Sequence, residues 1–200
     1  MPYRPEHKQE TRERIVNSAR RLFNRKGFAE VTIDEIMADA GLTHGGFYKH
    51  FNAKEELYAE AILQFLCLDA PEPWQSRHVD ACAQGPELAR MIVNAYLSRE
   101  HFEDREGGCP LVALPSDVAR GGEAVKAAFR QVLNKMVVIL AASLPDHEAR
   151  KQALALAATC IGGMLVARAV DDSALAGDIR DAVRRLVFAT MGWEDGQGQV

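Results

Sequence analysis

Apolar residues recur at intervals of three and four along most of the chain, which is the spacing of α-helices that bury one face. The first such stripe consists of Ile15, Ala19, Leu22 and Phe23. Later stripes lie within residues 88–96, 125–140 and 179–187. The sequence has no run of alternating β-branched residues bounded by hairpin turns. The pattern therefore predicts an all-α fold of about nine helices.

Helix start signals are unusually dense between residues 32 and 55. Thr32 and Glu35 form a capping box, in which each side chain bonds a backbone N–H of the other residue. Ile33, Ile36 and Met37 supply the buried face of the short helix that follows, and we expect Gly41 to end it.

The next helix is expected to begin at Thr43 and to run to about His50, with Phe47 and Phe51 pointing inward. Asn52 then gives a further cap signal for a longer helix that reaches about Cys67. The sequence therefore predicts two short helices joined by a tight turn, followed by a longer one.

Proline and glycine mark the breaks in the remaining two thirds of the chain. A helix that crosses Pro115 must kink or break, because proline lacks the amide hydrogen and its ring clashes with the preceding turn. We expect Asp146 to cap a helix rich in small residues, Ser173 or Asp178 to cap the last helix, and Gly192 to end it.

Charge is distributed unevenly along the chain. The first 30 residues carry eight Lys and Arg against four Glu, whereas the whole chain has a formal net charge of −4. The remaining 170 residues therefore sum to a charge of −8. A basic end joined to an acidic body suggests that the N-terminal segment meets a polyanion.

The sequence gives little sign of metal, disulfide or membrane chemistry. The four cysteines lack CxxC spacing and do not cluster with histidines as zinc ligands do. The apolar stretch over residues 153–167 is shorter than the ~20 residues of a membrane span, and the first 15 residues lack the apolar core of a signal peptide. We expect a cytoplasmic protein with no bound cofactor, no metal and no membrane partner.

Residues 30–51, EVTIDEIMADAGLTHGGFYKHF, have the layout of a helix-turn-helix, whose second helix enters the major groove of DNA. With Phe47 and Phe51 inside, small, polar and basic groups would face the bases and phosphates. Arg4, Lys8 and Arg12 suit phosphate or minor-groove contact from a flexible arm, or else form a solvated charged tail. The residues predicted to contact DNA are Thr32, Thr43, His44, Gly45, Tyr48, Lys49, His50, Lys54, Arg4 and Lys8.

Over about residues 10–60 the sequence resembles the tetracycline-repressor-like (TetR) family of transcriptional regulators. The likeness is carried by Ile15, Ala19, Leu22, Phe23, Gly27, Phe28, Thr32, Ile36, Ala40, Gly41, Gly46, Tyr48, His50, Phe51, Lys54, Leu57 and Tyr58. Beyond residue 60 only the number and length of the helices match. Pro115 departs from the pattern, because it falls where this family has its sixth helix.

The resemblance implies a homodimer with an N-terminal three-helix DNA-binding domain, residues 1–54, continuous with a larger helical domain, residues 55–200, that binds an effector and dimerises. Such a regulator, most simply a repressor, binds a palindromic double-stranded DNA operator and is released by a small-molecule effector. The side chains suited to an effector pocket, each equally explained by core packing, are Met91, Tyr96, His101, Phe102, Cys109, Phe129, Met136 and Met164.

Small and apolar residues of the last two helices suit close packing between two copies of the chain, or between helices of one copy. The predicted interface consists of Ala155, Thr159, Gly162, Gly163, Ile179, Val183 and Leu186.

The sequence also allows functions other than that of a ligand-responsive regulator to be considered. An enzyme is disfavoured, because the chain lacks the HExxH, GxSxG, GxGxxG and phosphate-loop motifs. One alternative is a helix-turn-helix protein without a small-molecule effector. Another is a regulator that senses oxidants or electrophiles through an exposed, activated Cys109 thiol, although an inert cysteine explains that residue equally well.

Overall fold

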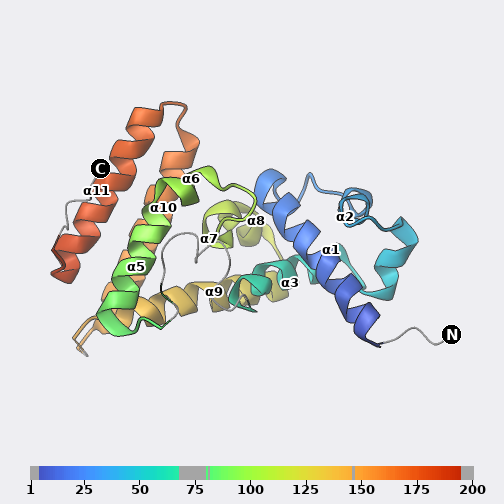
Figure 1. Cartoon of the computed structure of the whole chain (residues 1–200), viewed down its shortest axis with the longest axis horizontal. Helices are drawn as coiled ribbons and strands as arrows, with labels where there is room; N and C mark the ends of the chain where they lie inside the picture. The colour runs from blue at the N-terminus through green and yellow to red at the C-terminus, as the bar shows by residue number, and fades with distance from the viewer. Residues whose placement is uncertain (1–4, 68–79, 81, 146, 195–200) are drawn as a thin grey trace. The chain divides into compact units, whose positions relative to one another are not determined.

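The computed structural model describes residues 5–67, 80, 82–145 and 147–194. These residues form helices and connecting loops with no strand, so the expected all-α fold is confirmed. Figure 1 shows the helices in chain order. Their bounds are α1 Pro5–Lys26, α2 Ile33–Asp39, the 3-10 helix η1 His44–Lys49, α3 Lys54–Cys67, α5 Gly85–Leu97, α6 Arg99–Glu103, α7 Pro110–Ala113, α8 Pro115–Arg120, α9 Glu123–Ala141, α10 Ala149–Ala169 and α11 Ser173–Met191.

The described part of the chain thus has eleven helical segments, against about nine expected. The additional segments are short. α6 has five residues, and the chain over residues 110–120 divides into α7 and α8 because Leu114 leaves helical geometry directly before Pro115. Proline therefore breaks the helix as its missing donor requires, and it then serves as the first residue of α8.

The chain divides into two compact units. One consists of Met1–Asp69 with Arg105–Val132, and the other of Ala70–Asp104 with Leu133–Val200. The boundary predicted at residue 54, between a DNA-binding domain and an effector-binding domain, stays a prediction. The two compact units group the chain in another way. A stretch from the second half of the sequence belongs to the N-terminal unit.

The core of the first unit is built on α1, which packs against α2, α3 and α7. Phe23 and Tyr58 meet edge to face with ring centroids 4.8 Å apart, and Phe28 stacks on Tyr58 at 4.7 Å. The predicted stripe of α1 is fully inside, together with both phenylalanines of the turn region. The buried residues here include Ile15, Ala19, Leu22, Phe23, Val31, Ile36, Met37, Phe47, Phe51, Leu57, Tyr58 and Ile62.

The loop before α7 is bound to the C-terminal half of α1 through backbone atoms. Nδ2 of Asn24 donates to the carbonyls of Glu106 and Gly108, at 3.0 and 2.9 Å. Farther along the chain, Asp117 accepts a hydrogen bond from the backbone N–H of Phe28 at 2.8 Å. A β-carbon on Gly27, which has a φ of +80°, would lie 2.7 Å from that carboxylate, so this turn has no room for a side chain.

The second unit is organised around α10, which packs against α11, α5 and α6. By length and composition alone α10 could cross a membrane, a property it shares with core helices of globular domains. Seven of its 21 residues are buried, and it packs on three other helices of this unit.

The start of the last helix is set by a different residue than the sequence indicated. α11 is capped by Asp172, whose side chain accepts from the N–H groups of Ala174 and Leu175. Ser173 and Asp178 were the expected caps, and Asp172 takes that role because its extended backbone places its carboxylate over the first turn. Gly192 ends α11 in the left-handed conformation, as expected. The cap expected at Asp146 lies outside the described residues.

Candidate nucleic-acid interface

The helix-turn-helix begins with the predicted capping box. The side chain of Thr32 accepts a hydrogen bond from the N–H of Glu35 at 3.1 Å. The Glu35 carboxylate bonds Lys26, and this contact, with the Thr32 backbone N–H, holds its pKa below the usual value. Thr32 is exposed, but its hydroxyl oxygen is used in the cap, so any contact with DNA would share that atom.

The turn between α2 and η1 depends on Gly41. Its φ of +66° lies in the left-handed region that favours glycine, and its N–H bonds the carbonyl of Ala38 at 3.0 Å. Nη2 of Arg14 bonds the carbonyl of Ala40 at 2.5 Å, which ties the end of α2 to α1. The turn is therefore held both by its own backbone and from outside.

The second helix of the motif is a single 3-10 segment, η1, rather than an α-helix. Thr43 occupies its N-cap position, although its side chain makes no capping hydrogen bond. Phe47 is fully buried and Phe51 is 1% exposed, as the sequence predicted. The opposite face is open to solvent and presents Thr43, His44, Gly45, Tyr48 and Lys49. Contact of these residues with DNA stays a prediction.

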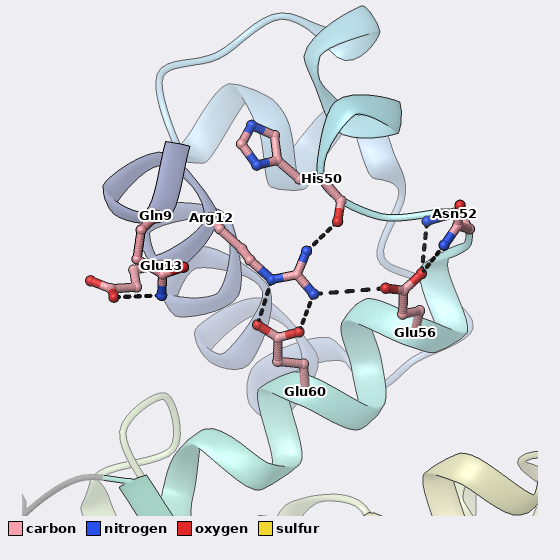
Figure 2. A network of polar contacts seen from close by, with 7 residues as sticks. All are labelled: Gln9, Arg12, Glu13, His50, Asn52, Glu56 and Glu60. Atoms are coloured by element: carbon pink, nitrogen blue, oxygen red, sulfur yellow. Dashed lines mark hydrogen bonds and ion pairs between the residues drawn. The ribbon is translucent and has the colours of Figure 1, made fainter. Parts of the chain in front are cut away.

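Arg12 connects α1 to α3 and to His50, at the end of η1, which we call the recognition segment (Figure 2). Its guanidinium makes a two-pronged contact with Glu60, with Nε 3.0 Å from Oε1 and the second bond between Nη2 and Oε2. Nη1 donates to the carbonyl of His50, and the group lies 4.0 Å from the ring centre of Phe51. Arg12 is thus engaged within the protein, and the expectation that it belongs to a flexible phosphate-binding arm is wrong.

Glu56 completes this network from the first turn of α3. Its Oε2 accepts from both the backbone N–H and the side-chain amide of Asn52, at 2.8 and 2.9 Å (Figure 2). Oε1 lies 3.7 Å from Nη2 of Arg12. These contacts, the backbone bond first, lower the pKa of Glu56. α3 begins at Lys54, so Asn52 lies farther before the helix start than the sequence indicated, and there it donates two hydrogen bonds to Glu56.

Lys54 also has an internal role that the sequence did not reveal. Its ammonium donates to the carbonyls of Phe28 and Val31, each at 2.6 Å, and lies 4.2 Å from the ring centre of Phe28. Burial lowers its pKa. An ammonium has three N–H donors, and two of them are used in these bonds. The phosphate contact expected of Lys54 stays a prediction, and it would use the third donor.

His50 lies half-buried where positive charges gather. Its Nδ1 is buried and has no hydrogen-bond partner among the described residues. Burial, followed by the charges of Lys8, Arg12 and Lys49, lowers its pKa, which favours the neutral imidazole. Lys8 is exposed and belongs to α1, not to a flexible arm. Arg4 lies outside the described residues.

His44 has an acidic partner that sequence reasoning missed. Its Nδ1 lies 2.5 Å from Oδ1 of Asp34, in the first turn of α2, and its ring centre is 5.9 Å from that of Tyr48. No spacing rule links positions 34 and 44, because the two residues belong to different helices on either side of a turn.

The residues expected to line an effector pocket are distributed over both compact units. Cys109 and Phe129 belong to the first unit, and the other six belong to the second. Tyr96, His101, Met136 and Met164 are buried, whereas Met91 and Phe102 are half-buried. Nδ1 of His101 lies 2.6 Å from the Tyr96 carbonyl, and the two rings meet edge to face at 4.8 Å. Their role as a pocket stays a prediction.

The residues expected at a dimer interface fall into two sets: those that pack within one chain and those that are at least partly open to solvent. Gly163 is buried against Val183 within one chain, so its small size serves packing between α10 and α11. Ala155 and Leu186 are exposed, and a β-carbon on Gly162 would meet nothing within 4 Å. Thr159 and Ile179 are half-exposed, and the hydroxyl of Thr159 bonds the Ala155 carbonyl in its own helix.

Comparisons with known proteins identify the N-terminal region. Residues 15–61 match the family model of bacterial regulatory proteins of the tetR family. The chain is 48% identical over 57 residues to the uncharacterized HTH-type transcriptional regulator YerO of Bacillus subtilis, and 44% identical over 61 residues to the HTH-type transcriptional regulator TtgR of Pseudomonas putida. These alignments cover 28% and 30% of this chain, but only 20% of YerO and 29% of TtgR.

A solved structure extends the likeness to the fold of the whole chain. The TetR-family regulator from Cytophaga hutchinsonii superposes with a TM-score of 0.71 at 20% identity, over 98% of this chain and 100% of that one. Identity at this level shows the fold alone. Residues 15–61 therefore form a helix-turn-helix domain of the tetR-family type, and the chain as a whole has the all-helical fold of the Cytophaga hutchinsonii regulator.

Proposed function

We propose that the protein is a cytoplasmic transcriptional regulator that binds a palindromic double-stranded DNA operator as a homodimer. The observation that carries this proposal is the exposed face of η1, which presents small, polar and basic side chains. The rings of Phe47 and Phe51 anchor the segment in the core. A two-fold protein requires a two-fold site, so each subunit reads one half of the operator. Blocking transcription is the simplest consequence of such binding.

The rigidity of the motif supports sequence reading rather than loose attachment to DNA. Base recognition depends on side chains held in fixed register with the phosphate backbone. Here the end of the recognition segment is fixed through the bond between Arg12 and the His50 carbonyl, and the preceding turn through Arg14. Both arginines project from α1, which therefore serves as the frame of the motif.

A second copy of the chain is proposed to pack on the exposed apolar face of α10 and α11. This face includes Leu154, Leu165, Val166, Leu175 and Leu186, which are 39–57% exposed in the single chain. Apolar side chains gathered on neighbouring helices usually mark an interface. Burying them against their symmetry mates removes this surface from water.

Release by a small-molecule effector is the proposed means of control. A link toward α1 already exists within the first unit, because the loop before α7 is bound to Asn24 and Asp117 is bound to the backbone of Phe28. An effector that favours another placement of residues 105–120 would shift α1 and the motif framed on it. Coupling of about 1–3 kcal/mol would weaken DNA binding roughly 5- to 150-fold.

Sensing through Cys109 is the less favoured alternative. The residue is 2% exposed, whereas attack on an oxidant or electrophile requires an accessible thiolate. Cys160 is also buried, and burial raises its pKa to about 12, which keeps that thiol protonated. A regulator without any effector remains the other alternative, and a failure of every tested ligand to release DNA would favour it.

The proposed function is tested by selecting bound sequences from a random DNA pool with the purified protein. An enriched palindrome is the expected result. If each subunit contacts about four phosphates, the logarithm of the binding constant should fall with the logarithm of salt concentration with a slope of about −7. A folded protein that enriches no sequence under any condition tried would contradict the proposal.

A further inference from the structure

The imidazole of His44 is held on two sides at the start of the recognition segment. Oδ1 of Asp34 lies 2.5 Å from Nδ1, and the ring of Tyr48, one helical turn later, lies 5.9 Å away between centres. Both side chains of the pair are on the surface, with 48% of the His44 side chain and 76% of the Asp34 side chain exposed. The ring is therefore oriented while it remains open to a partner.

This arrangement fixes which ring nitrogen carries hydrogen. An ionised carboxylate has only acceptors, so a short contact between Asp34 and Nδ1 requires the hydrogen to be on Nδ1. In the neutral imidazole, Nε2 then has no hydrogen and presents a lone pair. The neighbouring Gly45 is exposed, and a β-carbon there would meet nothing within 4 Å, so residue 45 adds no side chain next to the ring.

A lone pair at this position selects among base edges. In the major groove, adenine N6 and cytosine N4 offer amino hydrogens, whereas guanine O6 and N7 and thymine O4 offer only acceptors. A neutral His44 with hydrogen on Nδ1 therefore suits an amino-bearing base and opposes guanine or thymine. A protonated ring, or one with hydrogen on Nε2, would have the reverse preference.

We propose that Asp34 is a specificity-determining positioning residue, which makes His44 a hydrogen-bond acceptor for adenine or cytosine at one position of each operator half-site. This inference rests on the proposed function and adds to it the class of base that is read and the residue that sets it. It also explains an exposed carboxylate on a DNA-reading surface, where an unpaired negative charge would repel phosphate.

The test compares base preferences of the wild type with those of His44→Ala, Asp34→Asn and the double variant, by selection from a random DNA pool. His44→Ala should identify the position, by loss of its preference. Asp34→Asn should relax adenine or cytosine preference there roughly 3- to 10-fold, the value of one hydrogen bond, because an amide can either accept from or donate to Nδ1. In the His44→Ala background, Asp34→Asn should have no further effect on base preference.

The matched control is Asp39→Asn, which removes the same charge from the same helix but breaks a 2.7 Å pair with Arg21 of α1. It should leave the preference at the His44 position intact. Since Asp34 and His44 are exposed, all variants should unfold at nearly the wild-type temperature, which a melting curve verifies.

The outcomes separate the two levels of inference. An enriched palindrome with no His44-dependent position, or an Asp34→Asn profile identical to that of the wild type, would overturn the role of Asp34 and leave the regulator intact. No enrichment by the folded wild-type protein would overturn both.

Discussion

A β-carbon on Gly163 of α10 would lie 2.6 Å from Cγ2 of Val183 of α11. Carbon atoms do not approach so closely, and the β-branched valine has little rotamer freedom with which to move aside. The two helices are therefore packed against each other at a position where α10 has no side chain. Gly162, the next residue back, has open space where its β-carbon would be.

This contrast predicts opposite effects of the same substitution at neighbouring positions. Gly163→Ala should destabilise the protein by about 1–2 kcal/mol, because overpacking of about 1–3 kcal/mol exceeds a helix-propensity gain of at most about 1 kcal/mol. Gly162→Ala should be neutral or stabilising by up to about 1 kcal/mol. Urea unfolding at one fixed protein concentration measures both, and adding Val183→Ala should rescue part of the Gly163→Ala loss. Equal effects of the two alanines would contradict the packing described.

Replacing Arg12 should weaken DNA binding although Arg12 itself does not need to contact DNA. Arg12→Lys cannot retain the two-pronged contact with Glu60 together with the bond to the His50 carbonyl, so we expect a loss of about 1–3 kcal/mol in folding stability and looser placement of η1. Arg99→Lys, in an exposed pair with Glu103, is the control and should cost less than about 0.5 kcal/mol. Thermal melting and operator titration measure the two effects, and a fully stable Arg12→Lys protein with wild-type affinity would rule out this role.

Acid should weaken the first unit through Glu56. Its pKa is lowered in the folded protein, so its contribution to stability is present above the unfolded value of 4.5 and is lost as pH falls through the folded value. Glu56→Gln should therefore be less stable than wild type at pH 7, and the difference should shrink as pH falls below about 4.5 and through the lowered pKa of Glu56. Melting temperatures at a series of pH values check this. Glu103→Gln removes the same charge from an exposed helix and should differ little from wild type throughout.

Tyr48 and Lys54 should separate DNA contact from structural support. Tyr48 is 61% exposed, so Tyr48→Ala should reduce operator affinity while leaving folding stability within about 0.5 kcal/mol of wild type. Lys54→Ala leaves the Phe28 and Val31 carbonyls without their donor, which should cost about 1–3 kcal/mol of stability in addition to any loss of affinity. Denaturant midpoints and DNA titrations distinguish the two. If Tyr48→Ala unfolds the protein, or Lys54→Ala leaves its stability unchanged, the assignment fails.

A charge on the apolar face of α11 should separate the proposed dimer. Leu186→Glu would place a carboxylate where its symmetry mate is expected, and we predict a monomer at micromolar concentration by size-exclusion chromatography with light scattering. Val138→Glu is the control, because Val138 is equally exposed, at 60% against 57%, but lies on α9. A dimer that survives Leu186→Glu and is lost with Val138→Glu would place the interface elsewhere.

Features that depend on short-range order are encoded directly in the order of the amino acids. Helical periodicity placed Ile15, Phe47 and Phe51 in the core, and the capping box at Thr32 and the glycine at residue 41 set the limits of α2, because caps, turns and amphipathic faces involve residues within about four positions of one another. For the same reason Pro115 predicted the break that separates α7 from α8.

Contacts between distant residues depend instead on how the helices pack. Arg12 and Glu60 are 48 positions apart, and the Phe28 amide and Asp117 are 89 apart, so no local pattern relates them. Whether Gly162 or Gly163 packs against its own chain likewise depends on how α10 turns toward α11. The sequence of an N-terminal helix does not show whether a basic side chain is available to bind phosphate or is already paired with a carboxylate. The side chain itself is read from the sequence, but its partner depends on the tertiary structure.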